Sequence, residues 1–409
     1  MTVLIGETSA PTESISQEVL ESRLARVREW MKESDADALV VYGAPGVLGS
    51  RTLTAGYVRY LTGWTTTALP AMLVVPREGT PTVITMGPHD TRAFALAASW
   101  FGNVIAAGAV DRYPEAVGSA LRAITGSGHV ATAGVGEMAG PLYQALLDQL
   151  AGHKRLDAQP AIDQLRLVRH PEEVRMHRIG ASISDSMITA AMEQAVLPGM
   201  SGPKLMADIE HAGRALGADT SATWLATGEK PVTTYMEQSE LAGSIGANDR
   251  VQLGTTLSYR GYFAQGLRIG VRGKPSARLR EYADILIEIQ DAALAAMRPG
   301  ALLHEVSDVI ESAIDRHCPY TREKDPFRFQ SCHGLGLSYV EPGMARDLNA
   351  RRDKTLDPAG VRIEPGMVIE VHPNFTVPDL GHVCAGDMAL VTEHGGEWLT
   401  AFPRGLHQL

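Results

Sequence analysis

Hydrophobic residues in the first third of the chain follow helical and extended patterns in turn. One helical face is marked by apolar residues spaced four, three and four positions apart, namely Leu20, Leu24, Val27 and Met31. This spacing predicts a helix from about residue 14 or 16 to residue 33. Short apolar runs bounded by turn-forming residues predict strands at 38–42, 71–75, 82–85, 103–106 and 129–132.

Further helical patterns between these strands indicate an α/β domain. They lie at about 90–100, 112–124 and 140–152. A longer helix is expected to begin near Pro171, which suits the first turn, with two acidic residues next to it to favour the helix dipole. We therefore predict a domain at 1–165 and a second domain at 166–409.

The second half repeats one pattern at an offset of 101 residues. Pro198-Gly199 and Pro299-Gly300 each follow one helical stretch and precede another. At matching distances after each pair come three apolar residues: Leu205, Ile209 and Ala212 in the first copy, and Val306, Ile310 and Ala313 in the second. Two copies are too few for a solenoid. The repeat instead predicts a pseudo-symmetric α+β domain with a site between its halves.

Composition narrows the range of partners. The chain has 37 Lys and Arg against 47 Asp and Glu, a net charge of -10, which argues against nucleic acid as the main ligand. No run of 18 apolar residues predicts a membrane span, and the first residues lack the pattern of a signal peptide. Three cysteines far apart are typical of free thiols in a reducing compartment. We expect a cytoplasmic protein that acts on a small molecule.

Motifs along most of the chain resemble the prolidase, aminopeptidase P and creatinase family. In chain order they are VRYLTGW (58–64), LRLVRHPEE (165–173), YRGYF (259–263), HGLG (333–336), EPGMV (364–368) and DMALVTEHG (387–395). The resemblance implies a smaller α/β N-terminal domain followed by a "pita-bread" α+β domain with a pseudo-two-fold repeat. It also implies a homodimer, because members are commonly dimeric.

The resemblance further implies where a metal centre would lie. Peptidases of this family hold two divalent ions with two Asp, one His and two Glu. Carried over one position at a time, these five ligands fall on Gly254, Gln265, His333, His372 and Gly386. The family's second active-site His falls on Val340. Only one of the five ligands is therefore kept.

The residues themselves support the loss of this centre. No Asp or Glu occurs from Arg250 to Arg280, the stretch that should donate two carboxylates. A pair of hard cations without carboxylate ligands is chemically unfavourable. We predict an enzyme with no metal and no other cofactor. One alternative stays open, in which a single ion such as zinc is held by His333, His372, His382, Cys384 and Asp387.

Three residues are predicted to be catalytic. His333 and His372 suit acid–base chemistry near neutral pH. Glu237 falls where creatinase, a relative that works without metal, carries a proton-transferring His, and a buried carboxylate can serve as a base. Each has a plain structural alternative: His333 as the cap of a glycine-rich turn, His372 as a hydrogen-bonded strand residue and Glu237 as an exposed loop acid.

Other polar and aromatic residues are predicted to bind substrate. Arg268 could hold a carboxylate by a bidentate fork, or form a salt bridge within a strand. Glu370 lies two positions before His372 and therefore on the same side of a strand. Trp64 falls where creatinase-like chains place an aromatic that reaches the partner subunit's site, although a core or interface Trp fits equally well. The remaining candidates are Gln265, Glu341, Asp387 and Tyr262, the last of which could be packing only.

These observations favour a metal-independent, creatinase-like hydrolase of a C–N bond in a small amidine, guanidine or amide. The creatinase pattern is itself incomplete, because Leu267 occupies the position of a creatinase Glu, which argues against creatine as substrate. Three alternatives remain. They are a metal-free lyase or isomerase acting on an amino-acid-like metabolite, a catalytically inactive binding relative, and an Xaa-Pro peptidase with a rebuilt metal site.

Overall fold

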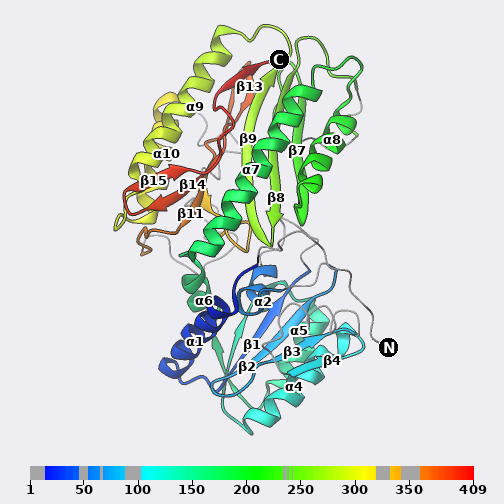
Figure 1. The fold of residues 1–409 in the computed structure, drawn as a ribbon, viewed down its shortest axis with the longest axis vertical. Helices are drawn as coiled ribbons and strands as arrows, with labels where there is room; N and C mark the ends of the chain where they lie inside the picture. The colour runs from blue at the N-terminus through cyan, green and yellow to red at the C-terminus, as the bar shows by residue number, and fades with distance from the viewer. Residues whose placement is uncertain are drawn as a thin grey trace.

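The computed structural model shows two lobes stacked along the long axis of the molecule (Figure 1). The lower lobe in this view is built from the first part of the chain, and the upper lobe from the remainder. The structure describes residues 14–45, 54–64, 68–87, 103–233, 236, 239–241, 243–318, 332–341 and 360–409.

A mixed sheet of six strands forms the centre of the lower lobe, in the order β4-β3-β2-β1-β5-β6. Its neighbours pair in parallel at β1/β5, β3/β4 and β5/β6, and antiparallel at β1/β2 and β2/β3. The strands are β1 (Ala38–Gly43), β2 (Ala71–Pro76), β3 (Thr82–Thr85), β4 (Asn103–Ala106), β5 (His129–Ala133) and β6 (Lys154–Asp157).

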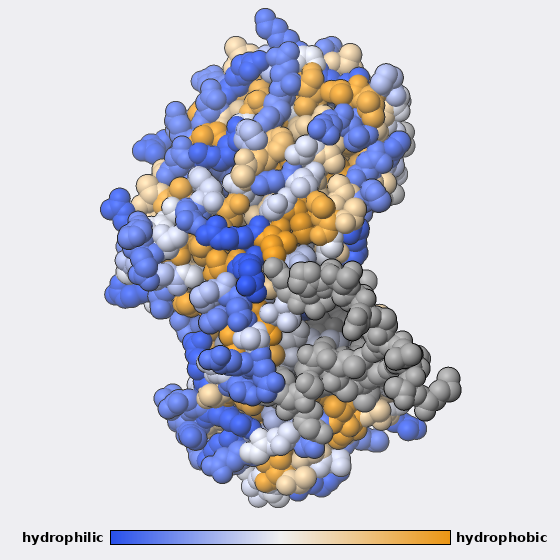
Figure 2. Space-filling view, in the orientation of Figure 1, coloured by the Kyte–Doolittle hydropathy of each residue, from blue (hydrophilic) through white to orange (hydrophobic). Residues whose placement is uncertain are grey.

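Helices cover both faces of this sheet. Val40 packs with residues of α4 and α5, whereas Leu39 packs with residues of α1, α2 and α6, because successive strand residues point to opposite faces. The helices are α1 (Gln17–Glu33), α2 (Ala55–Thr62), α4 (Tyr113–Ile124), α5 (Gly140–Gln149) and α6 (Gln159–Arg166), with short 3-10 turns η2 (Val110–Arg112) and η3 (Val135–Glu137). On the face shown in Figure 2, hydrophilic residues predominate over α1.

Most predicted elements of this lobe are confirmed. The first helix begins after Ser16, whose side chain caps it by accepting a hydrogen bond from the backbone N–H of Val19. Three elements were not predicted. Helix α2 is buried almost all round, so it lacks an amphipathic pattern, and β6 and α6 are short and polar. The helix predicted at 90–100 lies outside the described residues.

The upper lobe contains two larger sheets, each covered by a pair of helices. Strands in the order β16-β9-β8-β7 pack against α7 and α8, and strands in the order β10-β11-β14-β15 lie beside α9 and α10. Strands β12 and β13 form a separate pair. The helices are α7 (Pro171–Gln194), α8 (Gly202–Ala215), α9 (Ala277–Ala296) and α10 (Leu303–His317). The strands are β7 (Thr220–Gly228), β8 (Arg250–Tyr259), β9 (Tyr262–Val271), β10 (Cys332–Gly334), β11 (Val368–Val371), β12 (Phe375–Val377), β13 (Gly381–Val383), β14 (Asp387–Thr392), β15 (Gly395–Trp398) and β16 (Leu406–Gln408).

The predicted pseudo-two-fold repeat is confirmed in this lobe. Helices α8 and α10 begin 101 residues apart, at Gly202 and Leu303. Of the matching apolar residues, Ala212 alone is only half-buried; the other five are buried. The two sheets meet where the backbones of Leu267 and Gly386 exchange hydrogen bonds of 3.0 and 3.2 Å. This contact joins the two half-domains at the level of the predicted site.

Buried ion pairs connect the lobes. The Arg166 guanidinium donates to the Glu341 carboxylate at 2.6 Å, and Arg169 lies 3.0 Å from the other oxygen of Glu341. Glu341 was predicted to bind substrate, and the structure corrects this, because its carboxylate is taken up by the two arginines and by the backbone N–H of Ser338. Tyr262 needs a similar correction. It is 2% exposed, packs among lower-lobe residues and accepts a hydrogen bond from Arg23 at 3.2 Å.

One helical histidine makes the stability of this region depend on pH. His177, in α7, is fully buried, and burial, together with the nearby Arg169, lowers its pKa from 6.5 to about 3. The unfolded chain therefore binds a proton that the folded chain does not, and stability should fall as pH drops from about 6.5 toward 3. We expect H177Q to flatten this slope in urea unfolding. The half-buried His129, as H129Q, is the control, and equal slopes for the two variants would contradict the prediction.

None of the described helices is long and apolar enough to cross a membrane.

Candidate functional site

The site is built from side chains that the two upper sheets direct toward their junction. Residues directly opposite in antiparallel strands share one face of a sheet. By this register, one sheet presents Trp224, Gln252, Thr256, Gln265 and Leu267 on the same face. In the other sheet, His333 of β10 lies opposite Glu370 of β11, which lies opposite Met388 of β14. A contact of 3.4 Å from the backbone N of Gln265 to the sulfur of Met388 joins the two sets.

Two histidine rings lie edge to face in this junction. The ring centroids of His333 and His372 are 5.0 Å apart, with an angle of 68° between the planes. The Tyr339 ring lies 4.9 Å from His333 and 5.8 Å from Trp224, so a row of rings runs from Trp224 of β7 to His372, the residue after β11. The structure therefore brings these two rings together, and their joint action on one substrate stays a prediction.

Hydrogen bonds define what each imidazole offers. The Nδ1 atom of His333 lies 2.9 Å from the Gly334 carbonyl, to which it donates, so Nε2 carries a lone pair. The Nδ1 atom of His372 lies 3.2 Å from the side-chain nitrogen of Asn374. Because an amide nitrogen can only donate, His372 accepts there and carries its proton on Nε2. The pair thus presents one acceptor and one donor.

Burial keeps both imidazoles neutral at pH 7. Loss of solvation lowers the pKa of His333 to about 4. Burial, and then the neighbouring His333, lowers the pKa of His372 well below its usual value of 6.5. A neutral imidazole can accept a proton from water, whereas an imidazolium cannot.

Glu370 is the acidic member of the site. It is fully buried, and burial together with repulsion from Asp387 raises its pKa well above 4.5. Neither carboxyl oxygen has a hydrogen-bond partner among the described residues. Burial and repulsion both favour the protonated carboxylic acid over the carboxylate, and the protonated form can donate a proton.

Polar atoms without partners gather around these residues. Buried polar atoms are hydrogen-bonded in most proteins, so a concentration of such atoms points to a ligand site. Among the described residues the atoms without a partner include Gln252 Oε1, Thr256 Oγ1, Gln265 Oε1 and Nε2, His333 Nε2, both carboxyl oxygens of Glu370, and His372 Nε2. The set combines donors and acceptors without a free ionised group, which suits a neutral or dipolar molecule rich in N–H and C=O groups.

Arg268 and Asp387 do not belong to the binding surface, which corrects two predictions. All N–H groups of Arg268 are used inside the protein: two donate to Asp387 at 2.6 and 3.1 Å, and the others to backbone carbonyls. Asp387 also accepts from Gln290 and Thr400. Each side chain of this pair is 1% exposed. The pair connects β14 to β9 of the first half-domain.

The metal pair of the resembling peptidases does not fit these residues. Gly254 and Gly386 supply no side chain, and Gln265 supplies an amide where a carboxylate would be needed. At Gly386 a Cβ atom would lie 2.3 Å from Leu267 Cδ1 and 2.8 Å from Glu370 Oε1, so a side chain could enter only if these two buried side chains shifted. Within the described ranges, no three His, Cys, Asp or Glu side chains converge as metal ligands, the alternative set with His382 and Cys384 included.

The close contact at Gly386 leads to a stability prediction. G386A should destabilise the upper lobe by about 1–3 kcal/mol, because Leu267 or the backbone must shift to admit the new methyl group. The change in the free energy of unfolding, measured in urea, checks this. In the double variant L267A/G386A the clash is relieved, so its destabilisation should be smaller than the sum of the two single values. Strict additivity would contradict the packing described above.

Of the other predicted residues, one lies in the lower lobe and one lies outside the described residues. Trp64 is half-buried against the hydrophobic cluster of the lower lobe. Glu237 lies outside the described residues. Gln252 and Thr256 were not predicted as site residues, although polar residues alternate with apolar ones along their strand, β8. Tyr339 was not predicted either, and no simple sequence pattern identifies it.

Comparisons with known proteins agree with this architecture. Residues 175–393 match the model of Metallopeptidase family M24, and residues 23–168 match that of the Creatinase/Prolidase N-terminal domain. An Xaa-Pro dipeptidase of Pyrococcus furiosus is 27% identical over 256 residues, 62% of this chain and 68% of that protein. An ectoine hydrolase of Halomonas elongata is 24% identical over 276 residues, 64% of this chain and 65% of that protein. The matched regions thus span about two thirds of each of these relatives.

Among solved structures, the prolidase of Thermococcus sibiricus superposes with a TM-score of 0.77 at 21% identity. The match covers 95% of this chain and 99% of that one, which establishes the two-lobed fold over nearly the whole length.

Proposed function

The chain belongs to metallopeptidase family M24, a family of hydrolases, and from this membership we propose that it hydrolyses a C–N bond without the family's metal pair. The substrate class is a small amidine, guanidine or amide. The observation that carries the proposal is the pair of buried imidazoles His333 and His372, with ring centroids 5.0 Å apart, beside the buried Glu370, at the junction onto which the family's metal ligands fall.

The chemistry needs a base, an acid and a means of holding the developing oxyanion. The Nε2 lone pair of His333 takes a proton from water while the water oxygen bonds to the substrate carbon. The carboxylic acid of Glu370 gives its proton to the leaving nitrogen as the C–N bond breaks. The side-chain N–H groups of Gln265 and the Nε2–H of His372 are the donors suited to the oxygen of the tetrahedral intermediate. Proton transfer from His333 back to Glu370 through water restores the starting state.

The similarity to ectoine hydrolase supports a substrate other than a peptide. The similarity to Xaa-Pro dipeptidases favours a second candidate, a peptidase whose ions are held by ligands outside this set. Both candidates are hydrolases, so the requirement for metal separates them.

The test is a panel of amidines, guanidines, amides and Xaa-Pro dipeptides, assayed with the full chain in H₂¹⁸O before and after dialysis against EDTA. The expected result is turnover of a non-peptide substrate that EDTA does not change, with one ¹⁸O atom incorporated into the product. Turnover of an Xaa-Pro dipeptide that is lost with EDTA and restored by Mn²⁺ would establish the second candidate. Turnover without incorporation of ¹⁸O would show a lyase or isomerase, and binding of panel members without turnover would show an inactive relative.

The proposal includes a homodimer in the cytoplasm, as the resemblance to dimeric relatives suggests. Sedimentation equilibrium measures the mass of the assembly directly. A mass near 44 kDa, that of one chain of 43.9 kDa, would contradict the dimer.

A further inference from the structure

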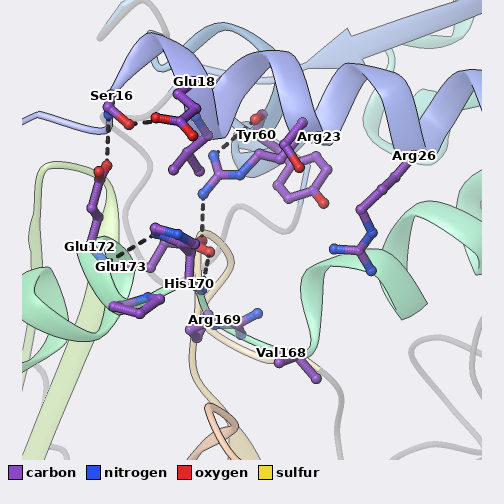
Figure 3. Close-up of a pocket in the computed structure, with 13 residues that line it drawn as sticks. Ser16, Glu18, Arg23, Arg26, Tyr60, Val168, Arg169, His170, Glu172 and Glu173 are labelled. Carbon is purple, nitrogen blue, oxygen red and sulfur yellow. Dashed lines mark hydrogen bonds and ion pairs between the residues drawn. The ribbon is translucent and has the colours of Figure 1, made fainter.

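A cavity whose lining does not include His333 or His372 lies where the lobes meet. It has a volume of about 460 Å³ and is walled by α1, by the segment 168–170 and by the first turn of α7 (Figure 3). Small-molecule sites typically have volumes of about 300–1,000 Å³ and are common between domains. Size and position therefore both suit a ligand.

Charged side chains of opposite sign line different ends of this cavity. Figure 3 shows Glu18 and Glu172 at one end and Arg26 at the other. Arg26 is exposed and forms no ion pair with any residue that the structure describes. Glu172 accepts hydrogen bonds from the backbone N–H of Ser16, at 2.7 Å, and from the Ser16 side chain, which leaves some of the carboxylate's lone pairs unused. Both ends therefore keep capacity for a ligand.

The first helix fixes the spacing of these charges. Glu18, Ser22 and Arg26 follow one another at four-residue steps, so they share one face of α1. At a rise of about 1.5 Å per residue, eight residues separate the acid from the base by about 12 Å. An extended tripeptide spans about 10 Å. The carboxylate of Glu18, the hydroxyl of Ser22 and the guanidinium of Arg26 thus match a ligand that has a cation at one end and an anion at the other.

Between the two ends, the cavity is lined by residues that are largely paired within the protein. Arg23 and Glu173 form a buried ion pair at 2.8 Å, and the terminal nitrogens of Arg169 bind Glu341 and the Leu335 carbonyl. His170 accepts the backbone N–H of Glu172 on Nδ1 at 3.3 Å, which leaves the Nε2 proton to donate. This one donor suits a carbonyl group of a peptide backbone.

We propose that this cavity binds a short zwitterionic peptide, with its ammonium group at Glu18 and Glu172 and its carboxylate at Arg26. This assignment does not depend on the reaction proposed above. The Arg169 side chain connects the cavity to the segment that follows His333, so a bound peptide would contact both lobes.

The test is isothermal titration of the full chain with triglycine, N-acetyltriglycine and triglycine amide. The expected result is saturable binding of triglycine, with an affinity at least about tenfold lower for each blocked form, because each loses one charged contact. R26Q and E18Q should each weaken triglycine binding by about tenfold or more. The matched controls K32Q and E29Q change exposed residues elsewhere on α1 and should leave the affinity unchanged.

A further variant separates this cavity from the two-histidine site. H333Q should bind triglycine with the affinity of the parent chain. Loss of binding in H333Q, equal affinity in R26Q and E18Q, or the absence of saturable binding would each overturn the proposal. None of these outcomes depends on whether the chain turns over an amidine, a guanidine or an amide.

Discussion

Replacing His333 by glutamine is expected to lower kcat/KM by about 10²–10⁴-fold, the usual contribution of a positioned acid–base group. Glutamine keeps a polar side chain of similar reach but has no lone pair basic enough to accept a proton from water. The imidazole Nε2 has no partner among the described residues, whereas the ring packs against Tyr339 and His372. The loss of rate should exceed what the loss of this packing explains, and thermal unfolding measures the packing contribution.

Steady-state kinetics on the substrate found in the panel measure this change. H129Q, in the lower lobe, is the matched control and should retain the parent rate. Thermal unfolding of both variants shows whether the fold is kept. A loss smaller than about tenfold in a folded H333Q would remove His333 from the proposed mechanism.

Changing Asp387 to asparagine is expected to produce the largest loss of stability, about 3–5 kcal/mol. The substitution keeps the shape of the side chain but leaves the Arg268 cation buried without an anion. Two charged hydrogen bonds, at 2.6 and 3.1 Å, become neutral at one end. An uncompensated buried charge is costly because it has lost its hydration.

The same chain offers an internal control for this prediction. Arg178 and Glu397 form an ion pair on the surface, with side chains 52% and 43% exposed. E397Q should change the free energy of unfolding by no more than about 1 kcal/mol. Urea unfolding of both variants compares the two pairs, and similar losses would contradict the structural role assigned to the buried pair.

The sequence predicted the architecture better than the site. Helices and strands depend on residues that are neighbours in the chain, whereas the roles of the site residues depend on residues far apart in the chain. Apolar periodicity marks which residues face a core, and strands such as β1 and β2 are visible from a few neighbouring positions. Helix α2 escaped detection because Tyr57, Val58 and Leu61 are all buried, so its pattern has no polar face.

Partners distant in sequence decide the roles of the polar residues. Arginine commonly binds substrate carboxylates, but the guanidinium of Arg268 already binds the carboxylate of Asp387, 119 positions later in the chain. Glu341 is likewise taken by Arg166 and Arg169 from the segment between the lobes. By contrast, the pairing of His333 with His372 followed from family positions that the fold brings together.

The packing of Leu267 against Gly386 also constrains how a carboxylate could be introduced at position 386. A glutamate at 386 requires the side chain at 267 to shift or to become smaller, and a smaller residue at 267 leaves a cavity until the acid is present. Either order passes through a less stable intermediate. An engineered acidic site at this junction is therefore expected to need both substitutions at once.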